Sequence, residues 1–164
     1  MARLNRDVGP LRKEIALRAD VVTLLVAVVL ALGVSACGDP IAQSHVDANV
    51  PSSDQFHVLL KRDLHAFFRA ARGTEVAVDY ELLRPGPTQS GVAYPKYYLW
   101  ARVRNAPGVL VDEGAVRVAA VDRKRFDVTD FVSKRDIQSN PTAVEQVFPK
   151  ALADGIRSRA GAAS

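Results

Sequence analysis

The chain has 164 residues, of which 48% are hydrophobic and 24% charged, and its formal net charge is +4. This composition predicts one ordinary globular domain. The charge is too weak and too mixed in sign to predict nucleic-acid binding, which needs a concentrated basic surface. The single cysteine, Cys37, cannot form a disulfide within the chain, so the fold depends on its hydrophobic core.

The first 36 residues have the three-part plan of an export signal. Residues 1–20 are polar and rich in basic side chains, residues 21–32 (VVTLLVAVVLAL) carry no charge, and the small residues GVSA precede Cys37. The apolar stretch is shorter than the ~20 residues that span a bilayer. It also lacks the polar face of a helix packed on a globular domain. The segment is therefore predicted to direct export.

Residues 34–37, VSAC, resemble the cleavage box of bacterial lipoprotein precursors, in which an aliphatic residue and two small residues precede a cysteine. The resemblance implies that the Cys37 thiol receives a diacylglyceryl group and that a signal peptide, residues 1–36, is cleaved after Ala36. It implies a membrane-anchored cell-envelope protein facing the periplasm or the outside. An aspartate directly after the lipidated cysteine would favour retention in the inner membrane. This chain has Gly38 at that position, which favours the outer membrane. An uncleaved anchor and a soluble secreted protein with a free Cys37 are the alternatives.

The mature chain is expected to begin with a lipidated cysteine and a flexible tether, residues 37–53, because this stretch is polar and has no periodic apolar pattern. One α+β domain is expected at residues 54–158, followed by a disordered tail at residues 159–164. The domain opens with a helix, which Ser52 and Gln55 can cap. Apolar residues recur along it at helical spacing, at Phe56, Leu60, Leu64, Phe67, Phe68 and Ala71.

Alternation of apolar and polar residues then predicts a meander of four antiparallel strands. We expect them at residues 74–83, 96–105, 109–122 and 125–132. A long loop rich in proline and glycine separates the first two strands, and Gly114 is expected to form a bulge in the third. A final helix follows, with Val144, Phe148, Leu152 and Ile156 on one face and a kink at Pro149.

Both helices are expected to cover the sheet face that carries Val78 and Leu99. The order of elements resembles cystatin-like and nuclear-transport-factor-like α+β folds, in which an N-terminal helix lies on a curved antiparallel sheet. A helix, three strands and a helix also resemble double-stranded-RNA-binding domains, but an export signal argues against that class. A similar fold does not by itself indicate a similar function.

No catalytic motif is found in the sequence. His45, His57 and His65 are scattered and have no cysteine partners, so neither a metal site nor a cofactor is expected. His57 and His65 lie on the first helix with Lys61 between them, where solvated positions explain them better than a catalytic base.

The candidate binding surface is the sheet face opposite the expected helices. It would expose Tyr98, Trp100, Arg102 and Arg104, with Tyr94 in the neighbouring loop. Tryptophan, tyrosine and arginine are enriched at interface anchors. A solvated face of cross-strand ion pairs is the alternative.

Two functions remain open from the sequence. The first is a non-catalytic binding or assembly module, held on the membrane by acylated Cys37, whose partner is an envelope protein or polymer. The second is a small envelope hydrolase or ligand-processing domain with a pocket in the concave side of the sheet. An enclosed apolar pocket with a titratable group would favour the second.

Overall fold

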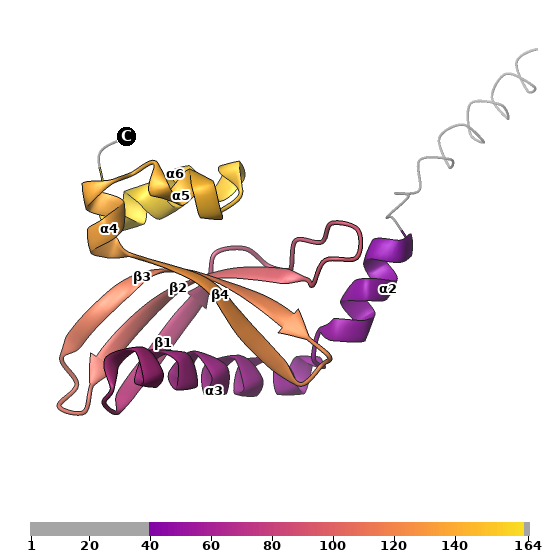
Figure 1. The fold of residues 1–164 in the computed structure, drawn as a ribbon, viewed down its shortest axis with the longest axis horizontal. Helices are drawn as coiled ribbons and strands as arrows, with labels where there is room; N and C mark the ends of the chain where they lie inside the picture. Colours follow the sequence, from indigo (N-terminus) through magenta and orange to yellow (C-terminus); the bar gives the residue numbers. More distant parts are fainter. Residues whose placement is uncertain (1–39, 163–164) are drawn as a thin grey trace, which may run out of the picture. The chain divides into compact units, whose positions relative to one another are not determined.

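The computed structural model describes residues 40–162, so the expected signal peptide and Cys37 lie outside the described residues. Figure 1 shows the elements of this part of the chain. They are α2 (Pro40–Asn49), α3 (Ser53–Arg72), β1 (Val76–Leu82), β2 (Lys96–Asn105), β3 (Leu110–Val121), β4 (Arg125–Ser133), α4 (Lys134–Ser139), α5 (Ala143–Val147) and α6 (Lys150–Ala160). Within residues 40–162, no helix combines the length and the apolar character needed to cross a membrane.

The four strands form one antiparallel sheet in the order β1-β2-β3-β4, which confirms the predicted α+β class and the meander. The pairing shifts register after Val103 and after Arg117, so the expected bulge at Gly114 is wrong. Gly114 pairs in register with Ser133. A Cβ atom at Gly114 would lie 2.3 Å from the carbonyl oxygen of Val132, so close approach of β4 requires glycine here.

The helix α3 covers one face of the sheet, as its apolar stripe predicts. Its buried residues lie four apart, at Phe56, Leu60, Leu64 and Phe68. They pack on the face of the sheet that carries Val78, Leu99 and Val103. Gly73 ends the helix in the left-handed conformation, and its N–H donates to the carbonyl oxygen of Arg69.

The helices α4, α5 and α6 cover the opposite face, so the expectation that both helical segments share one face is wrong. Figure 1 shows α3 and the C-terminal helices on opposite sides of the sheet. A second core joins Tyr98, Trp100 and Ala115 of the sheet to buried residues of these helices, at Ile137, Val144, Phe148, Ala153, Ile156 and Ala160. The C-terminal segment carries too much apolar surface to stay in solvent, and the free sheet face is the surface that can bury it.

The C-terminal segment consists of three short helices, where a single kinked helix was expected. Pro149 does not kink a helix but separates α5 from α6 as the residue that precedes the first turn of α6. The expected disordered tail is also wrong at Arg159 and Ala160, which belong to α6. Ala160 is buried, and its carbonyl oxygen accepts a hydrogen bond of 2.7 Å from Gln138 Nε2.

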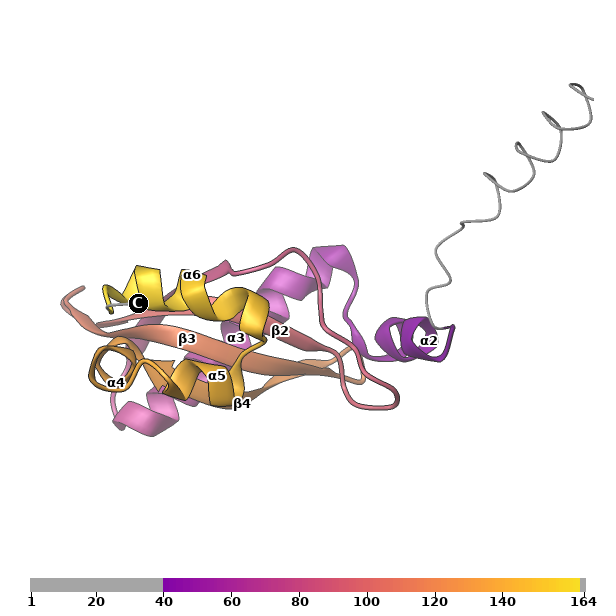
Figure 2. The same cartoon turned by 90° about the horizontal axis from the view of Figure 1, so that it is seen from above.

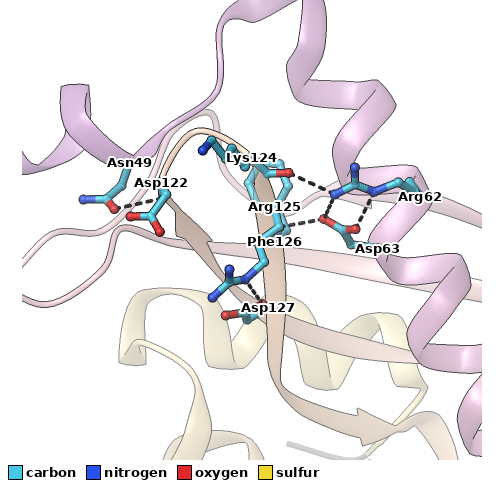
Figure 3. A network of polar contacts seen from close by, with 8 residues as sticks. All are labelled: Asn49, Arg62, Asp63, Asp122, Lys124, Arg125, Phe126 and Asp127. Atoms are coloured by element: carbon cyan, nitrogen blue, oxygen red, sulfur yellow. Dashed lines mark hydrogen bonds and ion pairs between the residues drawn. The ribbon is translucent and has the colours of Figure 1, made fainter.

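The expected flexible tether is wrong from Pro40 to Asn49, where the chain forms α2. The side chain of Asn49 is buried, and its Oδ1 accepts a hydrogen bond of 3.1 Å from the backbone N–H of Asp122 in the β3–β4 turn (Figure 3). The backbone oxygen of Asn49 accepts a second bond, of 2.9 Å, from the N–H of Arg123. Asn49 therefore ties the end of α2 to the β3–β4 turn, a contact that hydrophobic periodicity does not reveal.

The β3–β4 turn is also held by α3. Asp63 Oδ2 accepts a hydrogen bond of 2.7 Å from the N–H of Phe126, and Arg62 donates one of 2.9 Å to the carbonyl oxygen of Lys124 (Figure 3). Both central residues of the turn, Asp122 and Arg123, have positive φ, as a tight hairpin turn requires. Contacts from two helices stabilise this strained turn.

Candidate functional site

The two aromatic residues of the predicted binding face are not on the surface. Trp100 is 2% exposed and Tyr98 is also buried, because α4, α5 and α6 cover them. The Tyr98 hydroxyl shares a hydrogen bond of 2.7 Å with Thr88 Oγ1. Their expected exposure is wrong, and neither side chain can anchor a partner on the folded domain.

The other three predicted binding residues are exposed or half-buried but lie at opposite ends of the domain. Tyr94 is in the β1–β2 loop, where its ring stacks on His45 of α2 with the centroids 6.3 Å apart. Arg102 and Arg104 lie at the far end of β2, beside the β2–β3 hairpin. Arg104 Nη1 donates to the carbonyl oxygen of Gly108 in that hairpin, at 3.2 Å.

Arg102 belongs to a row of charges that runs from the sheet to α4. It pairs in register with Glu113, and the closest approach of Arg102 Nε to Glu113 Oε2 is 3.9 Å. Glu113 Oε1 accepts a hydrogen bond of 2.5 Å from Lys134 Nζ. This bond to Lys134 lowers the pKa of Glu113 from its usual range, against the opposing effect of partial burial, and the indole N–H of Trp100 contributes to the lowering. Glu113 is therefore ionised at neutral pH.

A cleft of about 380 Å³ lies beside this row. Its walls are mostly charged, with two aliphatic and two neutral polar residues, and they comprise Arg72, Leu110, Val111, Asp112, Glu113, Ser133, Lys134, Arg135, Asp136 and Gln138. The hydroxyl of Ser133 donates a hydrogen bond of 2.6 Å to Asp136 Oδ2 and accepts one of 3.1 Å from the N–H of Asp136. Ser133 thus caps α4, and its hydroxyl is bonded to Asp136 both as donor and as acceptor.

Three consecutive aliphatic residues extend from the cleft along the hairpin. Val109, Leu110 and Val111 are all exposed, Val109 to 59%. The hairpin is nevertheless ordered by hydrogen bonds, since Asn105 Oδ1 accepts one of 2.9 Å from the N–H of Val109. An apolar patch bordered by charges is the usual composition of a protein interface. We call Arg102, Arg104, Val109, Leu110, Val111 and Lys134 the hairpin-end surface.

The sequence placed Val109 to Val111 in the third strand, which is correct for Leu110 and Val111, but it did not show that this end of the strand is exposed. The run of three apolar residues directly after the turn residues Pro107 and Gly108 was the available signal. Only one face of a strand points to a given core, so a run at a hairpin tip leaves apolar side chains uncovered.

The three histidines have structural partners. His57 shares a hydrogen bond of 2.7 Å with the Tyr80 hydroxyl, and His65 lies 3.1 Å from Glu75. His45 contacts the carbonyl oxygen of Val92. Among residues 40–162, no group of three His, Cys, Asp or Glu side chains is placed to hold a metal ion.

Comparison of the chain with known proteins found no matching family model, no matching curated protein and no matching solved structure. The resemblance to cystatin-like and nuclear-transport-factor-like folds therefore has no structural match behind it. A functional proposal rests on the chain's own residues.

Proposed function

We propose that the protein is a lipid-anchored cell-envelope module that binds or assembles with an envelope partner through the hairpin-end surface. The observation that carries the proposal is the exposed run Val109, Leu110 and Val111 beside the ionised cleft of Glu113 and Lys134. The bilayer anchor is supported by the VSAC box at residues 34–37.

The position of the anchor supports this use of the surface. Cys37 is three residues before Pro40, so an acyl chain on its sulfur would keep the start of α2 within about 11 Å of the attachment point. Each buried methylene contributes ~0.8 kcal/mol, so two acyl chains hold a protein stably on a bilayer. The hairpin lies at the end of the domain away from α2 (Figure 2). An anchor at α2 therefore leaves the hairpin-end surface free for a partner.

The chemistry of the surface favours binding over catalysis. The cleft is open to solvent, and its three carboxylates are already bonded, Glu113 to Lys134, Asp112 to Arg72 and Asp136 to Ser133. Aliphatic side chains supply buried area to an interface, while the rim charges supply orientation and partner choice. The partner is expected to be an envelope protein with an apolar centre and a charged border.

Two measurements test the proposal. The intact mass of the membrane-extracted protein should correspond to a chain that starts at Cys37 and carries acyl groups, and unmodified mass at Cys37 would contradict the anchor. A photo-crosslinking residue at Val109 should give a discrete adduct in intact cells, and Leu110→Asp should abolish it. The matched control is the same probe at Val58, an exposed position on α3. Equal adducts from the two positions would contradict a hairpin-end partner.

A further inference from the structure

Exposed aliphatic and aromatic side chains also gather at the α2 end of the domain. Ile41 of α2 is 62% exposed, Val92 of the β1–β2 loop is 78% exposed, and Tyr94 of the same loop is exposed as well. His45 of α2 joins the helix to the loop, because its Nε2 donates to the carbonyl oxygen of Val92 and its ring stacks on Tyr94. We call Ile41, His45, Val92 and Tyr94 the α2-end surface.

Among residues 40–162, the exposed large apolar side chains lie at two opposite ends of the domain, except Val58 of α3. The β2–β3 hairpin, which carries Val109, Leu110 and Val111, lies at one end, and α2 lies at the other (Figure 2). Exposed apolar groups at two separate places indicate two different binding surfaces, each with its own partner. The sequence indicates the bilayer as the partner at the α2 end, since Ile41 is only four residues after Cys37, the expected site of lipidation.

We propose that the α2-end surface lies in the headgroup layer of the bilayer that holds acylated Cys37, an inference that rests on the proposed lipid anchor. Four residues of extended chain span at most about 14 Å, so an anchored Cys37 keeps Ile41 close to the bilayer surface. Tyrosine favours the interface of a membrane because its ring is apolar and its hydroxyl remains hydrated. The contact fixes the domain in one orientation, with the hairpin-end surface directed away from the lipid.

Apolar insertion drives this contact, and attraction to anionic headgroups contributes little. The β3–β4 turn beside α2 and the first residue of β4 carry three cations, Arg123, Lys124 and Arg125. Three nearby acids, Asp47, Asp122 and Asp127, offset them in formal charge. Arg125 Nε is paired with Asp127 at 2.9 Å, and Arg123 Nε donates to the backbone oxygen of Asp47. Membrane contact should therefore persist at high ionic strength.

The single cysteine makes a direct test practical. In the lipidated protein the Cys37 sulfur is blocked, so Val92→Cys supplies the one thiol for a nitroxide label. The labelled full-length protein is reconstituted into vesicles of phosphatidylethanolamine and phosphatidylglycerol. Power saturation then compares collisions with oxygen, which concentrates in the bilayer, and with a water-soluble nickel chelate. The matched control is Val109→Cys at the other end of the domain.

We expect the ratio of oxygen to nickel collisions to be several-fold higher for the Val92 label than for the Val109 label, at low and at high salt. Equal, water-like ratios for the two labels overturn the α2-end surface and leave the anchor intact. A ratio that falls to the control value at high salt contradicts apolar insertion. The protein without an added cysteine is the labelling blank, and uptake of label by that protein shows a free Cys37. That result overturns the lipid anchor and the inference with it.

Discussion

The guanidinium group of Arg159 lies over the indole ring of Trp100, with the Cζ atom 5.8 Å from the ring centroid. Arg159 Nη2 also donates to Glu81 Oε2 of β1, at 2.7 Å. The last turn of α6 is thereby fastened to two neighbouring strands, and the tryptophan is enclosed between the sheet and the C-terminal helices. A residue that resembles an interface anchor in the sequence is a core residue in the fold.

Trp100→Ala should lower the free energy of unfolding by about 3–5 kcal/mol, because a large buried ring is removed and a cavity remains. Urea unfolding followed by far-ultraviolet circular dichroism measures this change. The matched control is Arg102→Ala, two residues further along the same face of β2 and exposed. It should change stability by less than about 0.5 kcal/mol. Similar small effects of both substitutions would show that Trp100 is not enclosed.

Gly114→Ala should destabilise the domain by about 1–3 kcal/mol or prevent folding, since its Cβ would lie 2.3 Å from the Val132 carbonyl oxygen. Gly155→Ala is the control, because Gly155 is inside α6 and its added Cβ would have no heavy atom within 4 Å apart from its chain neighbours and the helix's own backbone. This second change should raise stability by about 0.5–1 kcal/mol through helix propensity. Thermal melts of the two variants should therefore shift in opposite directions, and parallel shifts would contradict the close approach of β4.

Glu113 should make stability depend on pH in the acidic range. Its hydrogen bond from Lys134 holds the folded-state pKa below the ordinary value of 4.5. The stabilisation is therefore present above pH 4.5 and is lost as the pH falls through the lowered pKa, where the carboxylate becomes protonated in the folded state. Glu113→Gln should be less stable than the wild-type protein at neutral pH, and this difference should shrink in acid.

Lys134→Met is the matched variant for the pH prediction, because Lys134 is the main cause of the lowered pKa of Glu113. It should flatten the same part of the stability profile while leaving the carboxyl group in place. Urea unfolding at a series of pH values measures both effects. A Glu113→Gln profile that runs parallel to the wild-type profile at every pH would contradict the assignment.

Asn49→Ala should release α2 from the sheet. The substitution removes the buried side-chain acceptor of the Asp122 N–H, and loss of such a hydrogen bond costs about 0.5–1.5 kcal/mol. Hydrogen exchange should become faster at the amides of Asp122 and Arg123, and then along α2. Gln43→Ala, which removes an exposed side chain from the same helix, should leave exchange unchanged at the turn. Unchanged protection in the Asn49 variant would show that α2 is held by other contacts.

The sequence by itself determined α3 and the four strands, but not α2 or the division of the C-terminal segment into three helices. The stripe from Phe56 to Phe68 has the spacing of a helix buried on one side, and the alternation along residues 96–105 has the spacing of a strand. Both periodicities follow from backbone geometry, which places side chains on faces without reference to the rest of the chain. The α+β class and the four-strand meander could be predicted for that reason.

Only the tertiary structure decided which faces are covered. Alternation placed Tyr98, Trp100 and Arg102 on one face of β2, but it did not show that α4 to α6 cover the two aromatic residues and leave the arginine exposed. Docking of α2 through Asn49 and exposure of the Val109 to Val111 run depend in the same way on chain segments far apart in sequence. Periodicity reports which side chains share a face, and the burial of that face depends on the apolar area that distant segments bring to it.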